Sequence, residues 1–561
     1  MDSIGFYSLE AFGGATFQTY LELGEDPWDY LRRLQKATPN TPIQALVRGQ
    51  NLVGQHNYAD DAVELFVRHA ARSGVDFFRF FDPLNDLRNM EVAIAAAKAA
   101  KKHVQGALCY AVSPAHSLDL WCSLAKGLAD LGCDEVVIKD TSGLLSPQAT
   151  WELVTGLIET AKLPVVVHSH CSSGMAPMAY MAAIEAGASV VDTAMSPLAS
   201  GASQPATESV VAALAGGDYD TGLDLERLVE IKDDLERLKE RHLHEVSALA
   251  DRVDSDILRY QMPAAMIHEI HTELGKHGAL DRMKDALAEV PRVRRELGYP
   301  PLVAPLRHMV AIQAVYNVIG GDRYDTVTQE LKDYLQGLYG TPPQPADSEL
   351  RRQVLGREEP ITVRPADLLE PEVAAAKADL KKQGFATGDD ALLSYLLFPA
   401  LATRLFKGEV KPTRASSDGE RAAQPEKKEE PAGEAPAPEP EPEPAAAAQT
   451  AEFEVEVEGE VFKVRVTGAG TIQVAGGGGG AAPAAAPKKP AQGAVVAPMQ
   501  GLIVKLPVKV GDDVKLGDVV AVLEAMKMQN DIVSTSPGKV VEIYVKEGEV
   551  VKPNQPILAV A

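Results

Sequence analysis

Two histidines and a lysine stand at the carboxyl ends of two short apolar runs. His168 and His170 are two positions apart in VVVHSH, and Lys139 follows EVVI in the preceding run. Side chains two positions apart on a strand lie on the same face, so both imidazoles point toward one place. A single histidine is more often a packed core group, but two at this spacing favour ligands of one metal ion. The sequence therefore predicts a metal site that includes His168 and His170, with Lys139 at a neighbouring strand end.

Lys527 lies in the motif EAMKM, between two halves of a repeat over residues 494–561. The halves are revealed by aligning Gly501, Val504, Val508, Gly511 and Val514 with Gly538, Val541, Val545, Gly548 and Val551. Two similar β halves predict a small pseudo-symmetric β-sandwich, with Lys527 at the tip of the connecting hairpin. AMKM closely resembles the attachment site of biotin carboxyl carrier domains, so we expect biotin on Lys527. A lipoyl group, carried by the same fold in a DKA-like context, is the weaker alternative, and an unmodified surface lysine is the third.

The strands that position the first group of residues are short β-prone runs separated by helical segments. Seven such runs occur, at 5–12, 42–49, 77–82, 103–111, 135–140, 164–170 and 189–195. Amphipathic segments such as DDAVELFVRHAARSG lie between them, which predicts a parallel sheet covered by helices. Polar residues at the strand ends favour a (β/α)8 barrel over an open sheet. Because such a barrel has eight strands and the first run begins almost at Met1, we expect the first strand to be missing.

The remaining sequence predicts a modular chain. Periodic charge in LERLVEIKDDLERLKERHLHEV indicates helices, the Pro, Ala and Glu repeats indicate an unpacked linker, and EFEVEVEGEVFKVRV alternates like a hairpin. We expect the barrel at 1–221, an α-helical domain at 222–410, a disordered linker at 411–451, a β-hairpin at 452–467, a flexible linker at 468–493 and the β-sandwich at 494–561.

The composition limits the partners and the compartment. The 561 residues include 79 acidic and 55 basic side chains, giving a formal net charge of −24, so a nucleic-acid partner is not expected. The 4 cysteines form no CxxC pair, which fits a reducing cytosol better than a disulfide framework. With no long apolar run and no basic leader, we expect a cytoplasmic protein, or one held peripherally at a membrane by partner subunits.

As a set, these motifs resemble the carboxyltransferase subunits of biotin enzymes that act on 2-oxo acids. This family includes the α subunit of oxaloacetate decarboxylase, the carboxyltransferase half of two-subunit pyruvate carboxylase and the central carboxyltransferase of transcarboxylase. The resemblance covers nearly the whole chain and rests on SLEAFGGATF, LVRGQNLVG, FFRFFDPLNDLRN, VIKDTSGLLSP, HSHCSSG, PATESVVAAL, YDTGLDL, GALDRM, ELGYPPLVAP and EAMKM. It implies metal-dependent transfer of a carboxyl group between biotin and a 2-oxo acid, with pyruvate and oxaloacetate as the expected pair.

The resemblance also implies roles for the candidate residues. Lys139 is expected to be carbamylated, which converts a cationic amine into an anionic ligand, and to bind a divalent metal ion (Zn, Mn, Co or Mg) with His168 and His170. Arg48 corresponds to the arginine that holds the substrate carboxylate, a role suited to its bidentate fork. The family's remaining metal ligand is an aspartate in an RDxHQS-like motif on the first strand, and this sequence has no such motif. That agrees with the count of seven strands and predicts a misplaced start codon or a truncated chain, unless a strand has been missed or replaced.

Two positions depart from the pyruvate carboxylase pattern. The tyrosine expected seven residues after Arg48 is Gln55. The threonine expected before SQP, which relays a proton between biotin and the substrate methyl group, is Ala202. Ser203, the next hydroxyl, is the candidate replacement in catalysis. Three polar residues of the FDPLND motif are expected to support the site from behind: Asp82, Asn85 and Asp86.

The expected mechanism uses the metal as a Lewis acid on the substrate carbonyl, which stabilises the enolate. No nucleotide motif is visible for ATP-dependent loading of biotin, so another subunit must perform that step. The expected partners are a biotin protein ligase, a biotin carboxylase subunit or membrane decarboxylase subunits, and further copies of the chain in a homo-oligomer. The direction of transfer stays open, as does a transcarboxylase role. The alternative from a different class is a biotin carrier and assembly scaffold with an impaired barrel.

Overall fold

The computed structural model describes most of the chain in two compact units, Met1–Glu426 and Lys427–Ala561. The described residues are 1–54, 56–242, 252–356, 359–410, 449–457, 460–468, 494–496, 501–515, 518–525, 528–534, 538–546, 550–551 and 555–560. Within them, no helix is long and apolar enough to cross a membrane.

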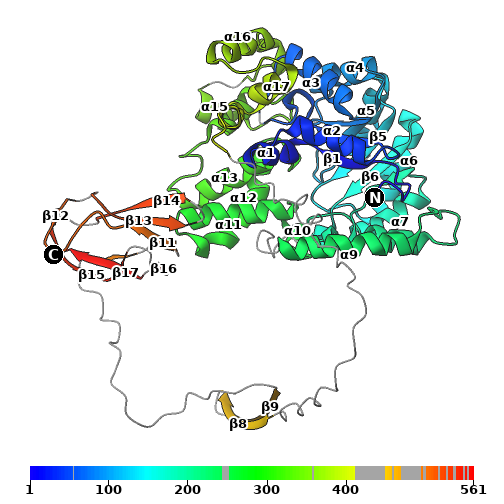
Figure 1. Cartoon of the computed structure of the whole chain (residues 1–561). Coiled ribbons are helices and arrows are strands. Elements are labelled where there is room, and N and C mark those ends of the chain that lie inside the picture. The colour runs from blue at the N-terminus through cyan, green and yellow to red at the C-terminus, as the bar shows by residue number, and fades with distance from the viewer. Residues whose placement is uncertain are drawn as a thin grey trace, which may run out of the picture. The chain divides into compact units, whose positions relative to one another are not determined.

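A parallel sheet of seven strands forms the centre of the first unit (Figure 1). The strands are β1 Leu9–Phe12, β2 Ile43–Val47, β3 Phe77–Phe81, β4 His103–Cys109, β5 Glu135–Asp140, β6 Val165–Ser169 and β7 Val190–Val191. Each strand pairs with the next one along the chain, and each lies inside one of the seven predicted runs. The strands are nearly continuous apolar runs because a parallel sheet of this class is covered on both faces. The predicted α/β barrel class is confirmed, as a curled sheet.

Helices follow the strands and cover the outer face of the sheet. They are α1 Gly14–Glu22, α2 Pro27–Ala37, α3 Asp60–Ser73, α4 Glu91–Ala99, α5 Leu118–Asp130, α6 Pro147–Ala161, α7 Ala176–Glu185 and α8 Thr207–Leu214. Local sequence starts several of them: the Ser146 hydroxyl accepts a hydrogen bond from the backbone N–H of Ala149, and Pro147 occupies the first turn of α6. Fully buried residues such as Phe66, Phe78 and Val154 join these helices to the sheet.

The sheet has two edge strands, β1 and β7. Among the described residues, no strand pairs with the outer edge of either one. A cavity of about 420 Å³ is lined by residues of both edge strands. They include Leu9 and Glu10 of β1 and Val190 and Val191 of β7. The part of the chain that the structure describes therefore supplies seven strands of a fold that closes with eight.

Helices make up the part of the first unit that follows the sheet. They are α9 Leu225–Arg241, α10 Asp256–Tyr260, α11 Ala264–Lys276, α12 Met283–Glu296, α13 Leu306–Ile319, α14 Gln329–Gln336, α15 Ser348–Leu355, α16 Val373–Gln383, α17 Asp389–Leu397 and α18 Pro399–Phe406. Helices α11 to α15 share a core of their own. Helices α16 to α18 return to the barrel, where Phe398 stacks on Phe17 and Asp390 lies 2.6 Å from His69 Nε2. We call the whole segment 225–406 the helical extension.

The second unit contains a hairpin and a small β-sandwich. The hairpin pairs β8 Gln449–Val457 with β9 Glu460–Gly468, where the sequence predicts alternating strands at 452–467. The sandwich strands are β10 Ala494–Val496, β11 Gly501–Lys505, β12 Asp513–Val514, β13 Val519–Ala525, β14 Met528–Val533, β15 Gly538–Ile543, β16 Val550–Val551 and β17 Pro556–Val560. Two four-stranded sheets have the orders β10-β17-β15-β12 and β14-β13-β11-β16.

The order of these strands shows the predicted repeat in three dimensions. Shifting the sequence from Gly501 to Gly538 carries β11 onto β15, β12 onto β16 and β13 onto β17, and the two sheets then have matching orders. Ala525 at the end of β13 pairs with Met528 at the start of β14. Lys527, the predicted biotin site, lies between them and outside the described residues, as do residues 411–448 and 469–493 of the predicted linkers.

Candidate active site

The predicted barrel residues meet in one cavity of about 540 Å³. Arg48 follows β2, Lys139 lies in β5, His168 lies in β6 and His170 follows it, and Ser203 lies in the loop after β7. The helical extension contributes further lining residues: Pro263, Ala264, Ala265, Val303, Ala304 and Arg307. Side chains far apart in the sequence are thus gathered at the carboxyl ends of the strands, where barrels of this class place their active sites.

Strand register places Lys139 beside His168. The two residues are partners in the pairing of β5 with β6, and the rings of His168 and His170 have centroids 5.2 Å apart. The next residues along the strands face away from the cavity and hold loops, since Ser169 Oγ donates to Asp140 Oδ2 at 2.8 Å. His168 and His170 therefore both face the cavity, as their spacing predicts.

His168 is oriented by a carboxylate behind it. Its Nδ1 lies 2.7 Å from Asp192 Oδ2, and Asp192 is also paired with the guanidinium of Arg79. Burial alone would raise the pKa of Asp192, but Arg79 and His168 lower it, and the net pKa is well below the usual range. An ionised carboxylate accepts a hydrogen bond from Nδ1–H, which leaves the lone pair of His168 Nε2 on the cavity side. Gln204 Nε2 lies 3.3 Å from that nitrogen.

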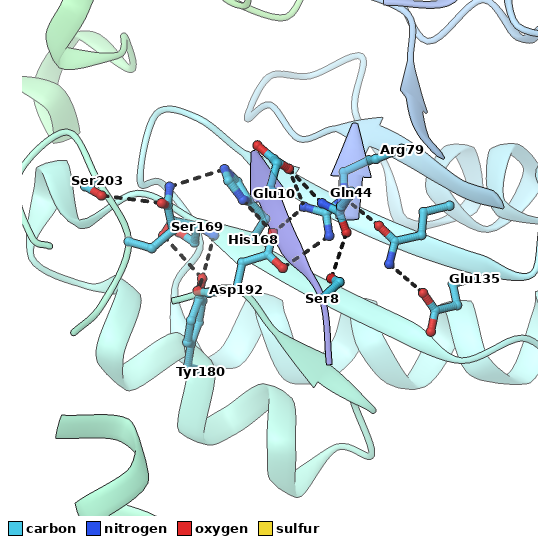
Figure 2. Close-up of polar contacts among 12 residues, drawn as sticks. Ser8, Glu10, Gln44, Arg79, Glu135, His168, Ser169, Tyr180, Asp192 and Ser203 are labelled. Atoms are coloured by element: carbon cyan, nitrogen blue, oxygen red, sulfur yellow. Dashed lines mark hydrogen bonds and ion pairs between the residues drawn. The ribbon is translucent and has the colours of Figure 1, made fainter. Parts of the chain in front are cut away.

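These contacts belong to a polar network that crosses the inside of the sheet. Figure 2 shows it running from Ser203 through His168 and Asp192 to Arg79, and from there to Glu10 and Glu135. Gln105 on β4 connects Arg79 on β3 with Glu135 on β5, accepting from Arg79 Nε at 2.7 Å and donating to Glu135 Oε2 at 2.6 Å. Arg79 is only 1% exposed. A buried guanidinium requires such partners, because an unpaired buried charge is strongly unfavourable.

Lys139 is a buried amine without a carboxylate partner. The residue is 6% exposed, and its Nζ lies 5.7 Å from the ring centroid of Phe81. Among the described residues, no hydrogen bond or ion pair to Nζ is found. Burial lowers the pKa of Lys139. A lowered pKa increases the fraction of uncharged amine, which is the form that reacts with CO₂ to give a carbamate and a proton.

The donor set fits a metal ion only if Lys139 takes part. In the described parts of the chain, no group of three or more His, Cys, Asp or Glu side chains is placed to hold a metal. Burial lowers the pKa of both His168 and His170, which favours the neutral form of each imidazole. Neutral imidazole is a common metal ligand, and a carbamate on Lys139 would supply the anionic oxygen that the pair lacks. The residues therefore fit a three-ligand site that leaves positions open for a substrate.

Arg48 presents a cation to the same cavity. Its Nη1 donates to the backbone oxygen of Gly54 at 2.8 Å, and no carboxylate partner is found for it in the described ranges. Burial lowers the pKa of Arg48, and the charge of Arg307 lowers it further. Gly49 follows with a φ of +32°, and a Cβ there would lie 2.5 Å from the backbone oxygen of Asn89. Glycine is thus required for the turn that carries Arg48 from β2 into the cavity.

Comparison with known proteins gives matching evidence for each part of the chain. Residues 81–235 match a family described as HMGL-like, residues 257–466 match the conserved carboxylase domain, and residues 489–560 match the biotin-requiring enzyme domain. The chain is 45% identical to a pyruvate carboxylase subunit of Methanothermobacter thermautotrophicus over 534 residues, which covers 95% of this chain and 89% of that protein. This chain belongs to the family of pyruvate carboxylase carboxyltransferase subunits. It is an enzyme of the biotin-dependent carboxyltransferase class, with a biotinyl domain at its C-terminal end.

A further relative and a solved structure are also similar to this chain. The 2-oxoglutarate carboxylase large subunit of Hydrogenobacter thermophilus is 37% identical over 578 residues, covering 95% of this chain and 86% of that protein. Among solved structures, the carboxyl transferase domain of Rhizobium etli pyruvate carboxylase with pyruvate and biocytin matches with a TM-score of 0.69 and 32% identity. That match covers 73% of this chain and 72% of that one.

One of the two departures from the family pattern, Ala202, lies at the cavity. Ala202 lines it without a hydroxyl, and the Oγ of Ser203 lies 3.4 Å from Gln204 Oε1, so this hydroxyl is connected through Gln204 to His168. Gln55 lies outside the described residues. A role for Ser203 in proton transfer stays a prediction.

The three polar residues of FDPLND, Asp82, Asn85 and Asp86, do not line the cavity. Asp82 Oδ2 accepts from the backbone N–H groups of Leu84 and Asp86, and burial raises the pKa of Asp82 to about 7. Asp86 accepts from the backbone N–H of Thr341 in the helical extension at 2.9 Å. These carboxylates therefore fix the loop after β3 and join it to the helical extension. Their support of the site is by way of that loop.

Five residues of the site were not singled out from the sequence: Glu10, Arg79, Asp192, Gln204 and Arg307. Arg79 carried a signal, since an arginine inside the strand FFRFF must find partners within the barrel. Asp192 stands at the end of the run SVVD, the same kind of position as Lys139. Arg307 had no recognisable signal in the sequence, because its closeness to Arg48 depends on how the helical extension packs on the barrel.

Proposed function

We propose that this protein transfers a carboxyl group between biotin on Lys527 and pyruvate, with oxaloacetate as the four-carbon partner. The observation that carries the proposal is the single cavity that contains Arg48, Lys139, His168 and His170. Relatives at 45% identity are named as pyruvate carboxylase subunits, and the similar Rhizobium etli domain was solved with pyruvate and biocytin. The direction we favour is carboxylation of pyruvate.

Arg48 binds the carboxylate of pyruvate in this proposal. It is an arginine of the barrel cavity that lacks an acidic partner among the described residues, and its planar fork matches a carboxylate. Burial strengthens that contact, since charge-assisted hydrogen bonds gain as water is excluded. Arg48 thereby orients the keto oxygen of the substrate toward the side of the cavity that carries Lys139 and the two histidines.

His168, His170 and Lys139 would hold a divalent metal ion, which when bound supplies a Lewis acid for the keto oxygen. The chain's own contribution is orientation. Asp192 fixes Nδ1 of His168 as the donor, so that Nε2 keeps its lone pair on the cavity side. Carbamylation of Lys139, which the unpaired buried amine favours, adds one negative charge to an otherwise neutral ligand set.

The reaction would break a methyl C–H bond of pyruvate and the bond between the carboxyl group and a biotin nitrogen, and would form a C–C bond, so the methyl proton must be carried to that nitrogen. Ser203 is the hydroxyl that we assign to this transfer. It lies in the cavity and is connected through Gln204 to His168, and Ala202 offers no alternative. Biotin on Lys527, when attached, carries the carboxyl group.

Loading of biotin requires a second subunit in this proposal, a biotin carboxylase that uses ATP and bicarbonate. The four cysteines, Cys109, Cys122, Cys133 and Cys171, are unpaired, which fits the reducing cytoplasm where we place the enzyme. The α subunit of a membrane decarboxylase is the competing assignment of direction.

Reconstitution tests the proposal. The full chain is biotinylated with a biotin protein ligase and mixed with a biotin carboxylase subunit, ATP, bicarbonate and pyruvate, and oxaloacetate is followed with malate dehydrogenase and NADH. We expect oxaloacetate only when all components and attached biotin are present. A biotinylated, folded chain that forms no oxaloacetate with an active biotin carboxylase would support the carrier and scaffold alternative.

A further inference from the structure

Arg307 is a second arginine of the cavity and comes from a different part of the fold. It lies in the first turn of α13 in the helical extension, whereas Arg48 comes from the barrel. Its Nε donates to Glu269 Oε1 on α11 at 3.0 Å, and its side chain is 31% exposed. Glu269 does not line the cavity. One edge of the guanidinium is therefore held from behind by Glu269, while the residue borders the cavity.

Arg48 and Arg307 lie close enough at the cavity for their charges to interact. Both residues line the cavity, and the charge of Arg307 adds to burial in lowering the pKa of Arg48. Like charges that perturb one another across a cavity repel, and this repulsion is relieved by an anion placed between them.

The cavity offers no anion of its own for this purpose. Among the described lining residues, Glu10 is the one acidic side chain. Its Oε2 accepts from Gln44 Nε2 at 2.8 Å and lies near Arg79, so it belongs to the network inside the sheet. Arg48 therefore has no acidic partner among the described residues, and Arg307 is paired with Glu269 through Nε alone, so the terminal nitrogens of Arg307 are left for a ligand.

We propose that Arg307 binds the second carboxylate of a 2-oxo dicarboxylic acid, the one that Arg48 does not hold. The proposal rests on the proposed function and deepens it. Pyruvate has one carboxylate and oxaloacetate has two, so the reaction itself creates or removes the group that Arg307 would recognise. Arg307 then discriminates between the two sides of the reaction, and Arg48 binds both of them.

The chemistry of Arg307 suits this task. Its Nε is occupied by Glu269, and no hydrogen bond from its two terminal nitrogens is found among the described residues. These nitrogens can donate two parallel hydrogen bonds to one carboxylate. Because Glu269 already fixes the long side chain, little further rotamer entropy is lost when the ligand binds.

Calorimetric titration of the full chain tests the proposal. The chain is prepared without attached biotin, so that no carboxyl transfer takes place, and is titrated with pyruvate and with oxaloacetate in buffer containing Mn²⁺. We expect Arg307→Gln to weaken oxaloacetate binding by roughly 10- to 100-fold and pyruvate binding by less than about 3-fold. Arg307→Lys keeps the charge without the fork and should fall between wild type and Arg307→Gln. Arg48→Gln should weaken both ligands.

Glu269→Gln is the matched control. It breaks the same ion pair as Arg307→Gln but keeps the guanidinium, so oxaloacetate should bind at least as tightly as to wild type. A loss of oxaloacetate affinity in Glu269→Gln equal to that in Arg307→Gln would mean that the ion pair only supports the fold, and would overturn the proposal. Equal weakening of pyruvate and oxaloacetate by Arg307→Gln, or no weakening of oxaloacetate, would overturn it as well.

A third titrant identifies the source of the second carboxylate. 2-Oxoglutarate carries two carboxylates before any carboxyl transfer, whereas pyruvate acquires its second one in the reaction. Binding of 2-oxoglutarate that is weaker than that of oxaloacetate assigns Arg307 to the transferred group, and tighter binding assigns it to a five-carbon substrate. If wild type binds neither pyruvate nor oxaloacetate, the proposed function itself fails, and this outcome is distinct from failure of the Arg307 assignment.

Discussion

Asp192→Asn is the most informative perturbation of the site because Asp192 touches both the buried network and a proposed metal ligand. Its carboxylate lies 2.7 Å from His168 Nδ1 and pairs with Arg79, which is 1% exposed. The substitution keeps the shape of the side chain and removes its charge. An amide can present either its oxygen or its NH₂ group to Nδ1, so the tautomer of His168 is no longer fixed.

Two magnitudes follow from these contacts. Loss of an orienting carboxylate behind a ligating histidine costs about 10- to 100-fold in metal affinity. Removing one partner of a buried ion pair costs about 3–5 kcal/mol. The lower value, about 3 kcal/mol, applies here because Gln105 still accepts from Arg79 and Glu10 lies nearby.

Competition for zinc against a chelator, read by elemental analysis of the folded protein, measures the first effect. Arg79→Gln is the matched variant, since it breaks the same ion pair and leaves the contact between Asp192 and His168. We expect both variants to unfold at lower denaturant concentration than wild type, and only Asp192→Asn to lose zinc affinity by roughly 10-fold or more. Wild-type zinc affinity in folded Asp192→Asn, or an equal loss in Arg79→Gln, would refute the assignment of Asp192 as an orienting residue.

Four further predictions follow from the site and the fold. His168→Ala and His170→Ala should each remove most of the bound ion, measured by elemental analysis, because each deletes one of three proposed ligands; normal metal content in both would reject the site. Dialysis of wild type in bicarbonate-free buffer should lower its metal content by reversing carbamylation of Lys139, and added bicarbonate should restore it; metal content that is indifferent to bicarbonate would argue against the carbamate. Lys527→Arg should abolish avidin binding and carboxyl transfer while the metal content and the unfolding of the first unit stay as in wild type; avidin binding by this variant would place biotin elsewhere. Burial and the charge of Arg294 lower the pKa of His116 from 6.5 to about 4, so the unfolded chain takes up a proton in this window before the folded one does. Stability should therefore fall by up to about 3 kcal/mol as the pH drops from about 7 to about 4, and His116→Gln should reduce this loss; an undiminished loss in this variant would contradict the role of His116.

The sequence allowed the strands of both units to be predicted because each carries a strong periodic signal. Parallel strands buried on both faces appear as short apolar runs, and all seven runs contain a strand. The aligned glycines Gly501 and Gly538 begin β11 and β15, so the internal repeat gave the symmetry of the sandwich. The residues Lys139, His168 and His170 could be placed together because strand ends of a barrel meet at one rim.

Contacts made through the helical extension could not be predicted in this way. Arg307 lies in a largely apolar helix, whose pattern indicates only that the helix is buried, and nothing local shows that this helix reaches the cavity of Arg48. The same limit applies to α16–α18, where Phe398 packs on Phe17 across more than 300 residues of chain. Such contacts depend on long-range packing of apolar surface, which is not directional.

The ion pair between Asp192 and Arg79 could not be predicted from the sequence for a different reason. Arg79 lies in β3 and Asp192 directly follows β7, which is not a neighbour of β3 in the sheet, so their contact crosses the barrel interior. Their residue types made an ion pair possible, but only the curvature of the sheet brings them together. Polar residues inside apolar strands therefore indicate that a buried network exists, and the structure is required to say which of them are partners.

Isotope exchange between ¹⁴C-labelled pyruvate and oxaloacetate tests the central claim most directly, because it requires only the barrel cavity, the substrate pair and biotin on the same chain. The full-length, biotinylated protein is compared with Lys527→Arg and with Arg48→Gln. We predict exchange in wild type and its loss in both variants. Absence of exchange in the biotinylated, metal-containing wild type, or undiminished exchange in Lys527→Arg, would contradict the assignment of this chain as a carboxyltransferase that uses its own biotin.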